Sequence, residues 1–144
     1  MTIRDERVVL DTNVWIFGLR RIPEFFACSL LLEQLNQLQV IIPLQVLREL
    51  QVNFTKNEFT KFCHLINQFP KQITIYWEKA KIETIRKYQN LGCDLGDAII
   101  AAHLEELAIN ILVSENRHFL EEIKGLPFRS LNSTEILLEL DIII

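Results

Sequence analysis

Residues 8–15 read VVLDTNVW, and this stretch decides the expected fold. Residues 7–10 form a mostly apolar run that predicts a short buried strand, and the polar Asp11, Thr12 and Asn13 interrupt it. Thr12 or Asn13 is expected to cap the helix that follows, because either side-chain oxygen can accept a free backbone N–H. Asp11 is the unusual residue here, since a carboxylate seldom lies among apolar residues unless it is paired or holds a cation.

Three further stretches place an acid or an amide in comparable surroundings: Glu49 in PLQVLREL (43–50), Asp97 in LGDAIIAA (95–102), and Glu115 with Asn116 in ILVSENRHF (111–119). A nearby lysine or arginine could neutralise one or two such residues. Several carboxylates that converge on one cleft would instead favour magnesium or manganese, which are hard ions that prefer oxygen ligands. The pattern therefore indicates a metal-dependent phosphodiesterase chemistry.

Strand-like and helix-like segments alternate along the whole chain. Short apolar segments predict strands, the last of them weaker, at residues 7–10, 40–42, 73–76, 111–113 and 128–131. Helical periodicity and capping residues predict helices after Asn13 and Pro43 and at residues 24–38, 55–69, 78–90, 94–108 and 133–140, the last capped by Ser133. This alternation predicts a single α/β domain over residues 1–144, with three α/β/α layers around a central, mainly parallel sheet of four to five strands.

The acidic positions are arranged as a shared site would need. In open parallel sheets, ligands bind beyond the carboxyl ends of the strands, near a reversal of the strand order. Asp11 follows the first predicted strand, and Glu115 and Asn116 follow the fourth. Asp97 lies in the first turn of a helix, and Glu49 lies about two turns into another. If the first and fourth strands are neighbours, all of these side chains can face one cleft.

The composition limits the class of protein. The chain has 144 residues, 49% of them hydrophobic and 24% charged, which is typical of one globular domain. A net charge of −4 argues mildly against a simple electrostatic coat for nucleic acid. It does not exclude a nuclease whose acidic site is neutralised by metal, and it is equally compatible with a basic partner. Cys28, Cys63 and Cys93 are widely spaced and expected to be reduced. Without a signal-peptide pattern or an apolar run of about 18 residues, we expect a cytoplasmic protein that does not enter the membrane.

Four pieces of the sequence resemble the PIN-domain ribonucleases, and more narrowly the VapC-like toxins of bacterial toxin–antitoxin pairs: LDTNV (10–14), Glu49 in its helix after an apolar strand and Pro43, GDAIIAA (96–102) and LVSENRHF (112–119). The closing SLNSTEILLEL (130–140) is similar to the family's last strand and helix. The resemblance extends over nearly the whole chain. LDTNV alone would be a weak signal, whereas four pieces in the family's order are specific.

The resemblance implies an endoribonuclease that depends on Mg²⁺ or Mn²⁺ and hydrolyses RNA phosphodiester bonds. The family's first three acids fall on Asp11, Glu49 and Asp97, which would be catalytic and would hold the metal. Its fourth catalytic position, an Asp in many members, falls on Asn116 beside Glu115, so one negative charge is missing and the number of ions stays open. Either of these two residues could still contribute an oxygen to the metal.

Five other residues take supporting roles in this interpretation. Thr12, Asn13 and Ser114 would orient the carboxylates through hydrogen bonds. Arg117 and His118 follow the fourth predicted strand and could contact RNA phosphate.

The resemblance also implies a protein partner, a cognate antitoxin that occludes the cleft. The apolar helical faces around Phe54, Phe59 and Phe62 offer a contact for that antitoxin or for a second copy in a homodimer. The apolar residues 140–144 are expected to pack against the body of the protein or a partner.

Two other functions fit parts of the pattern. An aspartyl phosphatase or phosphotransferase would use Asp11 as its nucleophile, but the second Asp expected two residues later is Asn13. A PIN-like binding module with little or no activity would explain Asn116.

Several residues also have purely structural interpretations, in which an acid serves as a helix cap or an ion-pair partner and a histidine belongs to the core: Asp11 as a cap, Glu49 paired with Arg48 or Lys56, Asp94 as the cap of the helix that holds Asp97, and His103 as a hydrogen-bonded core residue.

Overall fold

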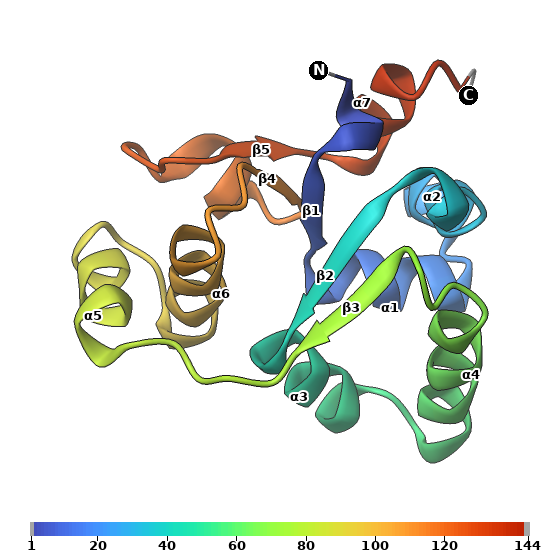
Figure 1. Ribbon diagram of the computed structural model, residues 1–144, viewed down its shortest axis with the longest axis horizontal. Coiled ribbons are helices and arrows are strands. Elements are labelled where there is room, and N and C mark those ends of the chain that lie inside the picture. Colours follow the sequence, from blue (N-terminus) through green and yellow to red (C-terminus); the bar gives the residue numbers. More distant parts are fainter. Residues whose placement is uncertain (1, 143–144) are drawn as a thin grey trace.

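Five parallel strands form the centre of the computed structural model, which describes residues 2–142 (Figure 1). The strands are β1 (Arg7–Leu10), β2 (Gln39–Pro43), β3 (Ile73–Tyr76), β4 (Ile111–Val113) and β5 (Arg129–Leu131). Their order across the sheet is β3-β2-β1-β4-β5, and every neighbouring pair is parallel. The predicted α/β/α fold around a parallel sheet is confirmed.

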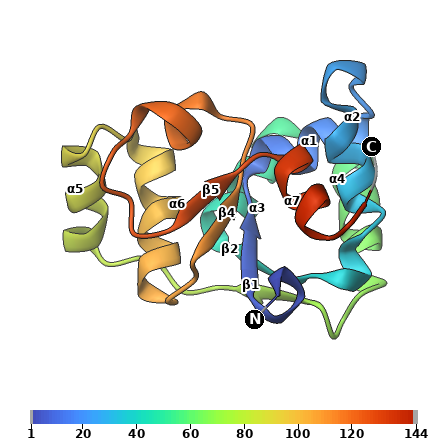
Figure 2. The same ribbon diagram turned by 90° about the horizontal axis from the view of Figure 1, so that it is seen from above.

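Helices cover both faces of this sheet. They are α1 (Thr12–Arg20), α2 (Phe26–Leu32), α3 (Leu44–Asn53), α4 (Lys56–Asn67), α5 (Ile82–Asn90), α6 (Leu95–Glu106) and α7 (Ser133–Glu139). Figure 2 shows α5 and α6 on one side of the strands, and α1, α2, α4 and α7 on the other. Because helices shield both faces, the inner strands β1 and β4 are apolar and buried after Arg7.

The strand order reverses at β1. The chain passes outward from β1 to β2 and β3, and then returns to place β4 on the opposite side of β1. Leu10 of β1 lies in register with Val113 of β4, so the residues that follow these two strands emerge side by side. The predicted neighbourhood of the first and fourth strands is confirmed.

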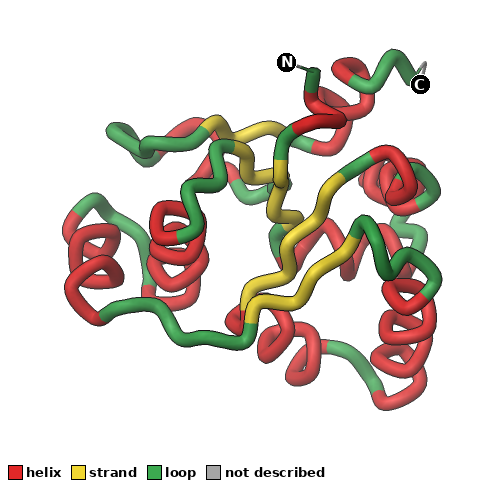
Figure 3. The backbone as a smooth tube through the Cα atoms, viewed as in Figure 1, coloured by secondary structure: helices red, strands yellow, loops and turns green. Residues whose placement is uncertain are grey.

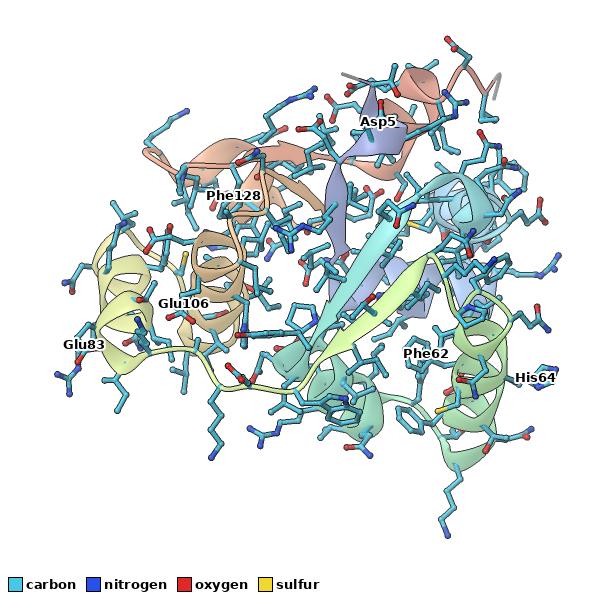
Figure 4. All side chains as sticks on the ribbon, viewed as in Figure 1. Asp5, Phe62, His64, Glu83, Glu106 and Phe128 are labelled. Carbon is cyan, nitrogen blue, oxygen red and sulfur yellow. The ribbon has the colours of Figure 1, made fainter. Side chains whose placement is uncertain are left out.

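An aromatic cluster joins α1 to α4. The rings of Trp15 and Phe62 meet edge to face with centroids 5.2 Å apart, and Phe54 and Phe59 pack against Phe62. Figure 4 shows Phe62 pointing toward the sheet while His64, two residues later on α4, points outward. Phe54 and Phe62 are buried inside the fold. The expectation that they face a partner is therefore wrong.

The helix predicted at residues 24–38 is broken into three pieces. A 3-10 turn (Pro23–Phe25) precedes α2, and a second one (Leu35–Gln37) follows it. Phe25 leaves the helical conformation at φ −121°, and its ring stacks on Phe17 with centroids 4.2 Å apart. This tertiary contact overrides the local leucine periodicity, although the leucines at the end of the segment are still buried.

Two helix starts also differ from prediction. The helix expected from residue 78 begins at Ile82, because the backbone N–H of Lys81 donates to Glu106 of α6 and residues 77–81 form the loop that crosses from β3 to α5 (Figure 3). Asn132, rather than Ser133, caps α7 by accepting from the backbone N–H of Glu135.

The remaining expectations concern the cysteines, the chain end and membranes. All three cysteines are free thiols, as expected. Leu140 is buried and Ile142 packs against the core, whereas residues 143–144 lie outside the described part of the chain. Within residues 2–142, none of the helices has the length and apolar character needed to cross a membrane.

Candidate active site

Asp11 stands where β1 passes into α1, at the reversal of the strand order. It caps α1 itself, since its Oδ1 accepts from the backbone N–H of Thr12 at 2.8 Å. The expectation that Thr12 or Asn13 is the cap is therefore wrong. Its own backbone N–H donates to Val113 of β4, which holds the first turn of α1 against the adjacent strand.

Asp11 is buried, with 4% of the residue exposed, and its carboxyl group carries two hydrogen bonds. Burial raises its pKa to about 7, while the hydrogen bonds from Ser114 and Thr12 act in the opposite direction. The negative charges of Asp97 and Glu49 raise the pKa further. Since these charges act on Asp11, the three acids share one region of the protein.

Ser114, which directly follows β4, connects Asp11 to the loop beyond it. Its Oγ is fully buried and donates to Asp11 Oδ2 at 2.7 Å. The same oxygen accepts from the backbone N–H of Asn116 at 2.9 Å and from Asn13 Nδ2 at 3.5 Å. Asn13 Oδ1 in turn accepts from the backbone N–H of Glu115. These contacts fix the carboxylate of Asp11 in one orientation.

Asp97 lies in the first turn of α6, which Asp94 caps by accepting from the Asp97 backbone N–H at 2.9 Å. Its half-buried side chain receives a hydrogen bond at Oδ2 from Asn116 Nδ2, at 3.1 Å. Burial and the charge of Asp94 raise the pKa of Asp97 to about 6, against the opposing effect of the Asn116 hydrogen bond. Glu49 also raises this pKa.

Glu49 approaches the other acids from α3. Its Oε1 accepts from Thr12 Oγ1, and its Oε2 accepts from Gln45 Nε2 at 2.9 Å. It forms no ion pair with Arg48 or Lys56.

Gly96 lets α6 come close to Glu49. A Cβ at position 96 would lie 2.9 Å from Glu49 Oε2, closer than real side chains allow. Sequence reasoning did not single out Gly96 or Gln45. Two signals were available: Gln45 lies one helical turn before Glu49, and Gly96 directly precedes Asp97 in the first turn of its helix.

Glu115 extends away from the other acids, toward α7. Its Oε1 accepts from the backbone N–H of Ser133 at 3.0 Å, and Cys28 Sγ lies 3.7 Å from the same oxygen. Arg117 is exposed, and the exposed His118 pairs with Glu122 at 3.0 Å. The structure thus brings Asp11, Glu49, Asp97 and Asn116 together and directs Glu115 elsewhere.

Comparison with known proteins places this arrangement in a family. The model of the PIN domain matches residues 8–125, which is most of the chain. The chain belongs to the PIN-domain family. A comparison with curated proteins found no match.

Several solved structures have a similar fold. One is VapBC2 from Rickettsia felis, whose structure includes a DNA fragment from the VapBC2 promoter. It has a TM-score of 0.59 and 22% identity, over 88% of this chain and 98% of that chain. FitAcB from Neisseria gonorrhoeae has a TM-score of 0.58 and 15% identity over the same shares. PAE2754 from Pyrobaculum aerophilum has a TM-score of 0.58 and 12% identity over 98% of each chain.

Within residues 2–142, none of the acids of this site forms an ion pair with a side chain of the protein. The ion pairs formed within residues 2–142 involve Glu58, Glu105, Glu122 and Glu139, all of them outside the site. The uncompensated charges and all-oxygen donors suit a hard divalent cation. As they stand, however, no three acidic, histidine or cysteine side chains in the described chain converge closely enough to enclose an ion. An ion would have to draw these carboxylates closer together.

Proposed function

We propose that this PIN domain is an endoribonuclease that depends on Mg²⁺ or Mn²⁺ and acts as the toxin of a toxin–antitoxin pair. One observation carries the proposal. Two acids with raised pKa values, Asp11 and Asp97, lie in one region near the reversal of the strand order, and neither forms an ion pair within residues 2–142. Such a concentration of buried negative charge is costly unless a cation or a proton offsets it.

The side chains have separate roles in the proposed reaction. Asp11, Asp97 and Glu49 would hold the ion, which when bound supplies an activated water and offsets charge on the phosphate. Ser114 orients Asp11, and Thr12 orients Glu49, because each donates a hydrogen bond to one carboxylate oxygen. No side chain has to form a covalent intermediate with the RNA.

The proposed toxin role requires an antitoxin, and it rests on the resemblance to VapC-like toxins together with the fold shared with VapBC2. A short neighbouring gene whose product relieves growth arrest would support it. Arg117, at the end of the loop after β4, and His118, the first residue of the helical turn that follows, are exposed and are the proposed contacts to RNA phosphate.

The decisive experiment compares Asp97→Asn with Asp94→Asn in a cleavage assay on single-stranded and structured RNA with Mn²⁺. Each variant removes one negative charge at the start of α6, and an asparagine at position 94 can still cap the helix. Asp97→Asn should lower cleavage by at least about 100-fold, because a metal contributes several kcal/mol to such reactions. Asp94→Asn should retain most of the activity. Equal activity of wild type and Asp97→Asn would contradict the proposal.

A second candidate, a PIN-like binding module with little or no activity, also has support. The Asn116 side chain directs an N–H group at Asp97 where another carboxylate would add charge, and the acids do not enclose an ion as they stand. Binding of Mn²⁺ by wild type without cleavage of any RNA would favour this candidate. Growth arrest by wild type but not by Asp97→Asn would favour the nuclease.

A further inference from the structure

A cavity of about 230 Å³ lies beside the acidic site, between α3, α6 and the segment that leads into α5. Its apolar wall includes Leu44 of α3, Ile85 of α5 and Ile99 of α6. This volume lies below the range of about 300–1,000 Å³ that is typical of pockets for drug-sized ligands. The cavity therefore suits a single small ring system.

Two helices connect the cavity to the acids. On α3, Gln45 lines the cavity and donates to Glu49, one turn further along the helix. On α6, Gly96 lies against Glu49, while Ile99 and His103 continue along the same helix face and line the cavity. Gly96 and His103 are seven residues apart, or about 10 Å along the helix. The cavity thus begins where the acidic site ends.

Two cationic side chains lie on the cavity wall. Arg48 and Lys79 are exposed, and neither takes part in the ion pairs found within residues 2–142. Phosphate groups are the ligands that Arg and Lys commonly bind at such positions. An anionic strand could therefore pass over the cavity mouth toward the acids.

One buried polar group lies in the cavity wall. His103 is 1% exposed, and its Nδ1 has no hydrogen-bond partner among residues 2–142. Burial lowers the pKa of His103, so the ring is neutral at pH 7 and offers one donor and one acceptor. The prediction that His103 is a core residue is confirmed, and the hydrogen bond predicted for its side chain is not made by Nδ1 within the described chain. This nitrogen is closed off from the cavity, so the polar contact to a ligand falls to the Gln45 side chain on the cavity wall.

We propose that this cavity receives one nucleobase of the RNA strand whose phosphate lies at Asp11, Glu49 and Asp97. This inference rests on the proposed nuclease function. A base has apolar faces and a polar edge, which suit the isoleucine and leucine wall and the Gln45 amide on it. Its sugar and flanking phosphates would lie near Arg48 and Lys79. The cavity would then select the base beside the cleaved bond.

The test is a double-mutant cycle between the cavity and the RNA. Ala80, half-buried on the cavity wall, is changed to Phe to fill the cavity, and Ala80→Ser is the matched control that leaves it open. Binding of a short single-stranded oligoribonucleotide and of versions with one abasic position is measured in EDTA by fluorescence anisotropy. Thermal melting establishes that each variant folds.

Wild type and Ala80→Ser should lose affinity by about tenfold when one particular base is removed. Ala80→Phe should bind the intact RNA about tenfold more weakly and should lose nothing further when that base is removed. A second comparison uses two exposed lysines and leaves the cavity unchanged. Lys79→Ala should weaken binding, whereas Lys61→Ala, the same change at an exposed position on α4, should not.

The outcomes separate this inference from the proposed function. Cleavage of RNA by wild type and by Ala80→Phe with the same base preference would overturn the cavity assignment and leave the nuclease intact. Failure of wild type to cleave any RNA would overturn the nuclease, and the anisotropy cycle would then decide the cavity on binding alone. If Ala80→Phe changes the oligomeric state in sedimentation without changing base dependence, a second copy occupies the cavity and the inference is wrong.

Discussion

Asn116 donates a hydrogen bond from Nδ2 to Asp97 Oδ2 at 3.1 Å, while its Oδ1 accepts the backbone N–H of His118 at 3.0 Å. A backbone N–H can only donate, so the second contact determines which end of the amide faces Asp97. Asn116 therefore presents a proton, and not an oxygen lone pair, to the acidic site. The arrangement stabilises a charged Asp97 when no cation is present.

Restoring a carboxylate at this position should make the protein depend on metal for stability. In Asn116→Asp, the donor to Asp97 becomes a second negative charge, which should lower the free energy of unfolding by about 2 kcal/mol without metal at neutral pH. Mn²⁺ should recover most of this loss, and calorimetry should show tighter Mn²⁺ binding. The control is Asn132→Asp, which adds the same charge but keeps the cap of α7. Equal losses in both variants would show that Asp97 is not involved.

The raised pKa of Asp11 predicts an unusual dependence of stability on pH. Burial raises the pKa of this carboxyl group from about 4 in the unfolded chain to about 7, so between these values the folded state binds more protons. The metal-free protein should therefore lose stability as the pH rises from about 4 to about 7, by up to about 4 kcal/mol. Urea unfolding at several pH values in EDTA measures this slope. Asp11→Asn should flatten it, and an unchanged slope in that variant would rule out Asp11 as its source.

Much of the fold could be predicted because local pattern and tertiary packing agree. Apolar strands that alternate with capped helices imply a parallel sheet, and the positions of β1 and β4 brought Asp11 beside the loop that contains Asn116. The predicted helices differ from the observed ones where a contact distant in the sequence determines the local conformation. Phe25 breaks its helix to stack on Phe17, and Lys81 delays α5 by donating to Glu106.

The site was harder to predict than the fold. The sequence marks Asp11, Glu49 and Asp97 as acids in apolar surroundings, and the structure places them in one region. The sequence alone, however, cannot reveal the direction in which a side chain points. Glu115 reaches Ser133, 18 residues away at the start of α7, while the backbone N–H of His118 turns the Asn116 amide so that its N–H group faces Asp97.

Chelation should stop cleavage without unfolding the protein. The core of this domain consists of apolar side chains around the sheet, and the acids are not part of that core, so the fold does not require an ion. Circular dichroism in EDTA should therefore retain the helical signal, while RNA cleavage is lost and returns with Mn²⁺. Loss of helical signal in EDTA would instead indicate a structural metal.

Gly96→Ala should separate the stability of the fold from the function of the site. Alanine is a better helix former than glycine, by up to about 1 kcal/mol, and the nearest atom that its Cβ meets is the end of a flexible glutamate, so the first turn of α6 should tolerate the change. The Glu49 carboxylate must move, however, because the new Cβ would lie 2.9 Å from its Oε2. We expect an unchanged or higher melting temperature and a cleavage rate lower by about tenfold, in the range seen when the groups that orient a metal ligand are lost.

The same substitution in a Glu49→Gln background identifies the cause. If Gly96 acts by making room for the Glu49 carboxylate, Gly96→Ala should have little further effect on cleavage or on Mn²⁺ affinity once that carboxylate has been removed. Additive losses in the double variant would mean that the new methyl group disturbs Asp97, the next residue of α6, rather than Glu49. Calorimetric Mn²⁺ binding distinguishes these results even where residual cleavage is too slow to measure.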